Sequence, residues 1–225
     1  MDTDVVLAAP LFAGIGPEAA RALLDRMRPV ELSRGQVLFS EGDVGDTLYV
    51  IERGKMKLGR RAADGRENLL SVLGPSEMFG ELSLFDPGPR TATLTAVGDV
   101  RLREIDHETI VQWLQAYPEV AKHLLESLAR RLRRTNDALA DLVFSDVPGR
   151  VAKALIELSE RFGEPAPGGV RVGHDLTQEE LAQLVGASRE TVNKALADYT
   201  NRGWVRREGR SVVLLDIARL ERRTR

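Results

Sequence analysis

The chain has no cysteine, few aromatic residues and no long apolar run among its 225 residues. The absence of cysteine excludes disulfides, iron–sulfur clusters, zinc fingers and thiol redox sensing. The longest apolar runs, such as Val212 to Leu215, are far shorter than the roughly 20 residues that cross a bilayer. The acidic N-terminus lacks the basic region of a secretory signal. We therefore expect a cytoplasmic protein with no membrane partner.

Histidine is also scarce, and His107, His123 and His174 are isolated in the sequence. A metal site or a Ser/His/Asp triad could form only by long-range assembly, because no local spacing of these residues matches either one. We therefore expect no metal and no enzymatic activity.

The charges are unevenly distributed, although the net charge is only −2. From Ser188 to the C-terminus there are ten Lys and Arg against five Asp and Glu, whereas the preceding 187 residues hold 22 against 29. This asymmetry indicates a local basic surface of the kind that binds nucleic acid. An ordinary basic tail would give the same count.

The apolar pattern predicts helices first and strands afterwards. Residues 1 to about 30 should be helical, with a helix that begins at Pro17 and stops at Pro29. From Val30 to Ile105, short apolar runs alternate with turn signals, which is typical of an antiparallel sandwich or barrel. The predicted strands are Val37–Phe39, Leu48–Ile51, Leu69–Leu73 and a segment over Thr91–Ile105, and the predicted turns are Glu41–Asp43, Gly45–Asp46, Arg53–Gly54 and Asp64–Gly65.

A long helix is predicted from about Pro118 to Phe144, because no Gly or Pro interrupts this segment. Its seam residues recur at spacings of three and four: Leu125, Leu128, Leu132, Thr135, Leu139 and Leu142. A seam this narrow usually needs a partner helix, so we infer a homodimer. A helix packed on its own domain is the alternative.

The segment Ser145–Gly149 should break this helix and act as domain boundary and hinge. Asp146 can cap the next helix, which should run from about Val147 to Phe162 with Pro148 in its first turn. A Gly/Pro-rich loop over 163–169 and a short strand over 170–172 follow. The predicted domains are residues 1–117, 118–145 and 146–225.

Residues 177–199 carry the pattern of a helix-turn-helix. Thr177 and Glu180 form a capping box, Gly186 supplies the positive φ of a turn, and Ser188 caps a second helix that runs to about Tyr199. Small or apolar residues fall at the buried positions: Leu181, Ala182, Val185, Ala187, Val192 and Ala195.

The second helix of this motif is the predicted recognition helix, whose N-terminal end would enter a major groove. Its exposed residues are Ser188, Arg189, Glu190, Asn193 and Lys194, and Thr177 and Gln178 on the first helix complete the predicted DNA-binding set. Arginine can pair with guanine, and glutamate can accept a hydrogen bond from cytosine. The alternative is a solvated face with a Glu190–Lys194 ion pair.

A wing should follow the recognition helix. Gly203 closes that helix, and two strands then flank Glu208-Gly209-Arg210. The predicted phosphate contacts on this hairpin are Arg206, Arg207 and Arg210.

The segment from Phe79 to Ala92 gathers residue types suited to an anion: Gly80, Glu81, Leu82, Ser83, Arg90 and Thr91. Arginine offers a charge-assisted fork for phosphate, the hydroxyls can donate, and the carboxylate can hold a sugar hydroxyl. A structural salt bridge between Arg90 and Glu81 is the alternative.

The motifs Gly80-Glu81-Leu82-Ser83 and Pro89-Arg90-Thr91-Ala92 resemble the phosphate-binding cassette of cyclic-nucleotide domains. The likeness continues in order through Ala129–Leu132, Asp146–Arg150 and Val185–Val192 and covers nearly all of residues 10–220. The chain is similar to the cyclic AMP receptor protein branch of the Crp/Fnr transcription regulators, above all to its actinobacterial global regulators. The resemblance implies an α+β fold: an N-terminal β-roll (a double-stranded jelly roll) that binds a cyclic nucleotide, a long dimerisation helix and a C-terminal winged helix-turn-helix domain.

The resemblance also implies residue roles toward cyclic AMP. Gly80 and Glu81 would meet the ribose hydroxyl and the cyclic phosphate, and Arg90 would ion-pair with the phosphate, helped by Thr91 and Ser83. From the dimer helix, further contacts would come from Arg131, from Thr135 to the adenine amino group, and from Asn136 of the other subunit. Two positions depart from the enteric relatives, which have Arg where this chain has Lys194 and Ser where it has Asn136.

The predicted function is that of a cyclic AMP-responsive homodimer that binds a palindromic, TGTGA-like operator in double-stranded DNA. Nucleotide binding would act through the hinge to align two recognition helices about 34 Å apart, and we expect contact with RNA polymerase at the bacterial nucleoid. One rival is a regulator of the same fold that ignores cyclic AMP or responds to another effector. A barrel enzyme is disfavoured because the barrel segment has no His-x-His pair or clustered carboxylates, and a module that regulates another protein is disfavoured by the helix-turn-helix and wing.

Overall fold

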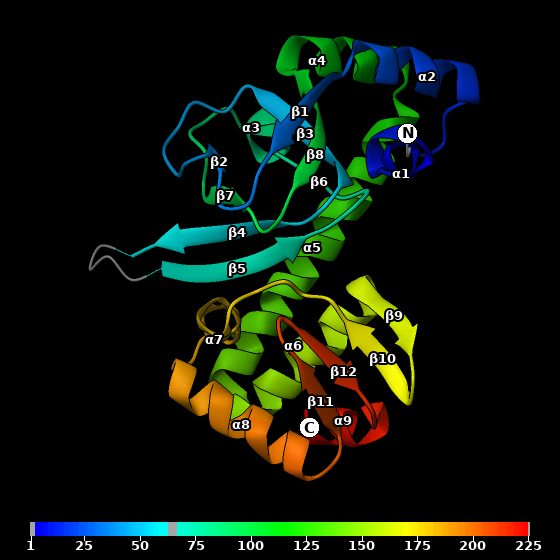
Figure 1. Cartoon of the computed structure of the whole chain (residues 1–225). Helices are drawn as coiled ribbons and strands as arrows, with labels where there is room; N and C mark the ends of the chain where they lie inside the picture. Colours follow the sequence, from blue (N-terminus) through cyan, green and yellow to red (C-terminus); the bar gives the residue numbers. More distant parts are fainter. Residues whose placement is uncertain (1–2, 63–66, 225) are drawn as a thin grey trace. The chain divides into compact units, whose positions relative to one another are not determined.

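The computed structural model describes residues 3–62 and 67–224. The chain divides into two compact units, one formed by residues 1–60 and 71–134 and the other by residues 61–70 and 135–225. The predicted turn at Asp64–Gly65 lies outside the described residues. Figure 1 labels the helices and strands of both units.

The N-terminal segment is helical, as predicted, with α1 (Thr3–Leu7), a 3₁₀ turn η1 (Pro10–Phe12) and α2 (Pro17–Arg26). Pro17 begins α2, but the prediction that this region stays helical to Pro29 is wrong. Strand β1 (Arg28–Leu32) starts earlier and includes Pro29. Because β1 is an edge strand of its sheet, a proline without an N–H is tolerated there.

Two antiparallel four-stranded sheets form the β-roll within the described residues (Figure 1). One sheet has the strand order β1-β8-β3-β6 and the other β2-β7-β4-β5. Their strands are β2 (Val37–Phe39), β3 (Thr47–Arg53), β4 (Met56–Arg61), β5 (Glu67–Leu73), β6 (Met78–Phe79), β7 (Thr93–Ala96) and β8 (Val100–Asp106). The predicted strand segments are confirmed, with the segment over 91–105 divided into β7 and β8.

The two sheets pack face to face around one apolar cluster. Leu94 and Ala96 of β7 belong to it, whereas Thr93 and Thr95 of the same strand are half-buried. Side chains from both sheets complete the cluster: Tyr49, Ile51, Met56, Leu73, Phe79, Val100 and Leu102. Removal of this apolar surface from water is the main stabilising contribution to the roll.

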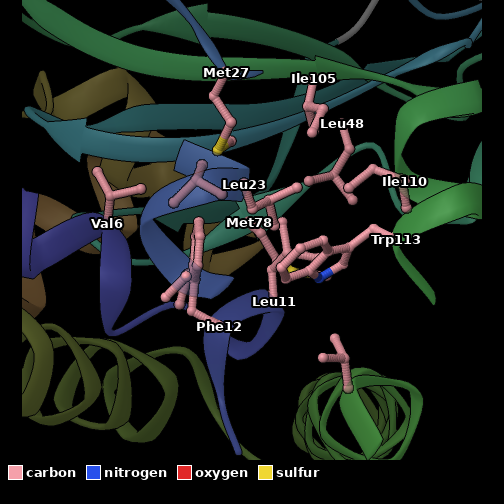
Figure 2. Packing of buried hydrophobic residues seen from close by; sticks show 14 of the residues in the cluster. Val6, Leu11, Phe12, Leu23, Met27, Leu48, Met78, Ile105, Ile110 and Trp113 are labelled. Atoms are coloured by element: carbon pink, nitrogen blue, oxygen red, sulfur yellow. The ribbon is translucent and has the colours of Figure 1, made fainter. Parts of the chain in front are cut away.

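A second apolar cluster joins the N-terminal helices to the roll (Figure 2). Leu11 and Leu23 from the N-terminal segment meet Leu48 of β3 and two residues of α4 (His107–Ala116), Ile110 and Trp113. Helix α4 begins after the last strand of the roll because the Asp106 carboxylate accepts a hydrogen bond from the Thr109 N–H at 2.8 Å. The N-terminal helices are therefore part of the core of the first unit.

Helix α5 (Glu119–Phe144) confirms the predicted long helix and its end before Ser145. Val120 and Leu124 at its start are buried in the second cluster. The predicted seam residues Leu125, Leu132, Leu139 and Leu142 are 64%, 62%, 62% and 51% exposed on the single chain. An apolar stripe of this length in water is unusual for an isolated helix.

Apart from residues 61–70, the second unit begins in the last turns of α5 and continues with helices and a small sheet. Its elements are α6 (Val147–Phe162), β9 (Gly163–Ala166), β10 (Gly169–Val172), α7 (Gln178–Val185), α8 (Arg189–Asn201), β11 (Val205–Glu208), β12 (Ser211–Leu214) and α9 (Ile217–Arg223). The sheet order is β11-β12-β10-β9. The predicted loop over 163–169 is wrong in part, because β9 pairs with β10 as an edge strand, where Pro165 is tolerated.

The predicted helix-turn-helix is confirmed with its caps. The Thr177 hydroxyl accepts from the Glu180 N–H at 3.1 Å, and the Glu180 carboxylate accepts from the Thr177 N–H at 2.7 Å. The Ser188 hydroxyl caps α8 by accepting from the Thr191 N–H. Of the predicted buried positions only Ala187 differs, since it is half-buried.

Gly186 is favoured by its backbone conformation, and it lies against the side chain of Leu142. Its φ is +69°, in the left-handed region, and a Cβ there would lie 2.8 Å from Leu142 Cδ2. The turn between α7 and α8 therefore packs closely against the last turns of α5 within the second unit.

The variant Gly186→Ala should lower the free energy of unfolding by about 1–2 kcal/mol for the left-handed backbone, with a further loss from the contact with Leu142. Urea denaturation followed by circular dichroism measures it. Gly203→Ala is the matched control, because Gly203 has a φ of +70° but no atom within 4 Å of the added Cβ. A Gly186→Ala protein no less stable than Gly203→Ala would contradict the close packing.

Candidate functional site

A buried arginine lies at the centre of the first polar site. Arg90 is 5% exposed, and its guanidinium carbon lies 4.4 Å from the centroid of the Phe39 ring and 5.9 Å from that of Tyr49. Its Nη2 donates to the carbonyl oxygen of Thr47 at 2.8 Å. Cation–π contact and one hydrogen bond compensate only part of the lost hydration of a guanidinium.

The loop that carries Arg90 is fixed through its backbone. The Arg90 N–H donates to the Asp43 carbonyl at 2.7 Å, and the Arg90 carbonyl accepts from the Gly42 N–H at 2.9 Å. Pro89 next to it forms a β-bridge with Val44. The predicted turn at Glu41–Asp43 thus holds the arginine in place.

Two glycines make room for this arrangement. Gly80 has a φ of +90°, and a Cβ there would lie 2.6 Å from the Thr47 carbonyl oxygen and 2.8 Å from Arg90 Nη1. At Gly45, a Cβ would overlap the hydroxyl of Ser83. Both positions therefore exclude any side chain.

Glu81 supplies a buried carboxylate to the same site. It is 2% exposed, and its Oε1 accepts a hydrogen bond from Arg131 Nη1 of α5 at 2.5 Å. The alternative salt bridge with Arg90 is not the arrangement found. Among the described residues, Glu81 Oε2 and the Nε and Nη1 atoms of Arg90 have no hydrogen-bond partner although they are buried. Such atoms suit a ligand that combines an anionic group for Arg90 with a hydroxyl for Glu81.

The structure thus brings together Gly80, Glu81, Ser83, Arg90 and Arg131. Leu82 is exposed at the start of the short helix α3 (Leu82–Phe85). Thr91 is exposed directly after Arg90. Thr135 and Asn136 are exposed on α5 in the second unit, and Thr135 follows Arg131 by one helical turn on the same face.

Sequence reasoning missed the residues that support Arg90, namely Phe39, Thr47, Tyr49 and Gly45. Gly45 was visible only as a turn signal, and no spacing relates positions 39 to 49 to position 90, because the sheet pairings create that proximity. Tyr49 is buried, and burial raises the pKa of its phenol.

A second polar site lies in the second unit, where a cavity of about 310 Å³ opens between the start of α7, the start of α8 and the β11–β12 hairpin. Arg189 from α8 and Arg207 and Arg210 from the hairpin line it, together with Thr177 and Gln178. Glu179 lines the cavity too, so three arginines face one carboxylate and the lining charge is net positive, which favours an anion.

Arg189, Glu190 and Lys194 on α8 are exposed. The alternative ion pair is present, since Lys194 Nζ lies 2.7 Å from Glu190 Oε1, which lowers the pKa of Glu190 and raises that of Lys194. An exposed pair of this kind contributes little stability and can be exchanged for other partners. Asn193 is half-buried, and its Oδ1 has no hydrogen-bond partner among the described residues.

The predicted wing is confirmed as a hairpin, but its arginines point to two faces. Arg207 and Arg210 line the cavity, whereas the Arg206 guanidinium binds Glu208 on the same strand at 3.0–3.1 Å. Alternate residues of a strand point to opposite faces, which explains why Arg206 and Arg207 of β11 differ, while Arg210 lies in the turn between the two strands. A phosphate contact by Arg206 stays a prediction.

The turn predicted to be the hinge is braced from two directions. Asp146 caps α6 by accepting from the Gly149 N–H at 2.8 Å, and its other oxygen pairs with Arg223 of α9 at 2.5 Å. The hydroxyl of Tyr199 on α8 donates to the Pro148 carbonyl at 2.6 Å. Burial raises the pKa of Tyr199 to about 12, so this phenol remains a donor at neutral pH.

Neither a membrane span nor a metal cluster is found in the part of the chain that the structure describes. No helix there is both long enough and apolar enough to cross a bilayer. No group of three His, Cys, Asp or Glu residues within residues 3–62 and 67–224 could hold a metal ion.

A β-roll that buries an incompletely paired arginine beside a carboxylate, followed by a long helix and a winged helix-turn-helix, defines a transcription regulator. The family model of the cyclic nucleotide-binding domain matches residues 29–117, and that of the Crp-like helix-turn-helix domain matches residues 149–223. The chain belongs to the Crp/Fnr family of transcription regulators, in its actinobacterial CRP-type group.

Its relatives include the CRP-like cAMP-activated global transcriptional regulator of Mycobacterium tuberculosis, which is 57% identical over 99% of both chains. The cyclic AMP receptor protein of Thermus thermophilus is 36% identical over 95% of both chains. Among solved structures, the c-di-GMP responsive global regulator CLP of Xanthomonas campestris superimposes with a TM-score of 0.75 at 28% identity, covering 88% of this chain and 99% of that one.

Asp146 should make stability depend on acid pH. The Arg223 guanidinium and the Gly149 N–H hold the pKa of Asp146 below its usual range. Its stabilising contribution is therefore complete above about pH 4, the range of an unfolded aspartate, and is lost as the pH falls through the lower folded-state pKa. Asp146→Asn should lower the free energy of unfolding at pH 7 by no more than about 1 kcal/mol, because the pair is partly exposed.

Urea denaturation at pH 7 and pH 3 measures this effect, and the difference between wild type and Asp146→Asn should shrink at pH 3. The control is Asp216→Asn, another helix cap, whose ion pair with Arg219 is longer at 3.6 Å. An equal difference between wild type and Asp146→Asn at both pH values would show that the carboxylate charge plays no part.

Proposed function

We propose that the protein is a cyclic AMP-responsive transcription regulator that binds a palindromic DNA operator as a homodimer. The observation that carries this proposal is the buried Arg90 guanidinium, with two nitrogens lacking a partner among the described residues, in a pocket that also holds a free oxygen of Glu81. An arginine at the surface would be hydrated by water, whereas this buried guanidinium needs another polar partner. A DNA-binding regulator of this kind would act in the cytoplasm, at the nucleoid.

The pocket residues fit a cyclic nucleotide by their chemistry. Arg90 would pair with the cyclic phosphate, with hydroxyl donors available from Ser83 and Thr91. Glu81 would accept from the ribose hydroxyl, while Gly80 lets the ligand approach the backbone. Arg131 already contacts Glu81 from α5, so the pocket and the long helix are directly linked within the first unit.

The proposed dimer rests on the exposed seam of α5. Leucines at positions 125, 132 and 139 recur every seven residues and are each more than 60% exposed on the single chain. A second copy of the helix would cover them in a coiled-coil-like pair. Thr135 in that seam, and Asn136 from the other subunit, would then hydrogen-bond the adenine base, which explains a polar residue at an apolar position.

The proposed DNA contact uses the second polar site. The start of α8 would enter the major groove with Arg189, Glu190 and Lys194 reading base edges. Arg207, Arg210 and the start of α7 would hold the flanking phosphates through the positive cavity. Ligand and DNA would be coupled because cyclic AMP binds one arrangement of the dimer more tightly than another.

A second candidate effector comes from the similarity to the c-di-GMP responsive regulator of Xanthomonas campestris. The Arg90 guanidinium and the Glu81 carboxylate could also bind another nucleotide that contains a phosphate group. Titrations with cyclic AMP, cyclic GMP and c-di-GMP separate these possibilities.

Arg90→Ala should weaken cyclic AMP binding by at least about 100-fold, because a charge-assisted contact to the phosphate is lost. Isothermal titration calorimetry measures the affinity. Arg60→Ala is the control, since Arg60 pairs with Glu41 on the surface of the same unit and should leave binding unchanged. Wild-type protein that fails to bind cyclic AMP, or an Arg90→Ala variant that binds normally, would refute the proposed ligand site.

Arg189→Ala should weaken binding to a TGTGA palindrome by about 10- to 100-fold while binding to unrelated DNA changes little, because a base contact is lost. Fluorescence anisotropy with labelled duplexes, with and without cyclic AMP, measures both affinities. Arg202→Ala at the other end of α8 is the control, because Arg202 pairs with Asp198. Equal losses on palindrome and unrelated DNA would assign Arg189 to phosphate contact instead of base reading.

A further inference from the structure

Arg150 joins the ends of two helices within the second unit. Its Nη1 donates to the Ser145 carbonyl at 2.7 Å, just beyond the last residue of α5. Its Nε donates to the Val185 carbonyl at 3.0 Å and its Nη2 to the Gly186 carbonyl at 3.2 Å, at the end of α7. One guanidinium thus connects the C-terminal end of α5 with the turn of the helix-turn-helix.

These contacts suit the chemistry of helix ends. The last carbonyls of a helix lack partners within it and carry the negative end of the helix dipole. A guanidinium offers five N–H donors in one plane, so it can serve carbonyls from two helices at once. A lysine at this position could keep the charge but could not fork between both ends.

A second contact places the same parts against each other. The Cδ2 atom of Leu142, in the last turn of α5, lies 2.8 Å from the position that a Cβ on Gly186 would take, so the end of α5 and the turn are in contact. Gly186 is followed after two residues by α8, whose start is the proposed base-reading end. Whatever fixes Gly186 against α5 therefore also fixes the direction of α8.

We propose that Arg150 is a positioning residue that fixes the direction of α8 relative to α5, and so the distance between the two half-sites that the dimer reads. This inference rests on the proposed function as a dimer that binds a palindrome. In such a dimer the paired α5 helices form the symmetry axis, so the angle between α5 and α8 in each subunit sets the separation of the two recognition helices. Loss of Arg150 should leave the helix-turn-helix of each subunit intact. The dimer should then accept a wider range of distances between the two half-sites.

The test compares palindromes whose two TGTGA half-sites are separated by spacers of different length. Each base pair inserted moves the second half-site by about 3.4 Å and turns it by about 34°. Wild-type protein with cyclic AMP should prefer one spacing over its neighbours by at least about tenfold, a coupling of ordinary size. Arg150→Ala should reduce this preference to less than about threefold, with little change on a duplex that carries a single half-site.

Arg161→Ala, near the opposite end of the same helix α6, is the matched control and should keep the wild-type spacing preference. Circular dichroism and cyclic AMP titration verify that each variant is folded and binds the nucleotide. If Arg150→Ala does not fold, Arg150→Lys is measured in the same way and should also show a reduced preference, because lysine cannot bridge both helix ends.

The outcomes separate this inference from the proposed function. Wild-type protein that binds no palindrome better than a single half-site would refute the dimeric function and the inference with it. Wild-type protein with a sharp preference that a folded Arg150 variant retains would overturn the inference alone. A variant that loses affinity equally for every spacing and for the single half-site would show that Arg150 only stabilises the fold.

Discussion

Burial of the Arg90 guanidinium is the constraint on which the arrangement of the first unit depends. A charged group with one carbonyl partner and two aromatic neighbours remains incompletely compensated. The left-handed Gly80 and the backbone bonds to the 42–43 turn hold it in place, although neither is needed to close a β-roll. The roll therefore keeps a buried, incompletely paired cation that lowers its stability, a departure from local consistency of the kind found at functional sites.

Several features with a local signal were predicted correctly. The length of α5, the Asp146 cap of α6 and the Thr177 capping box each depend on residues within a few turns of the chain, and each is confirmed. The pairing of the α5 seam with a second copy stays a prediction. The anion pocket was predictable from its motif only in part. Phe39 and Tyr49, which support Arg90, are distant in sequence and meet it only after the strands have paired.

The errors have a common physical origin. Pro29 was predicted to end a helical region, and residues 163–169 were predicted to form a loop. Instead, Pro29 lies in the edge strand β1 and Pro165 lies in the edge strand β9. Whether a strand is at an edge depends on the tertiary order of the sheet, which no local window contains. The contacts that stabilise the turn at residues 145–149 could not be predicted for the same reason. Arg223 and Tyr199 reach this turn from elements that are distant in the sequence.

The incomplete compensation of Arg90 also bears on how this family diverges. A buried cation with unsatisfied nitrogens is a burden on folding unless a ligand makes use of it. A lineage that gave up nucleotide sensing would gain stability by replacing this residue with an apolar one. Descendants that no longer bind a ligand here should therefore replace Arg90 first, while the strands of the roll and the helix-turn-helix persist.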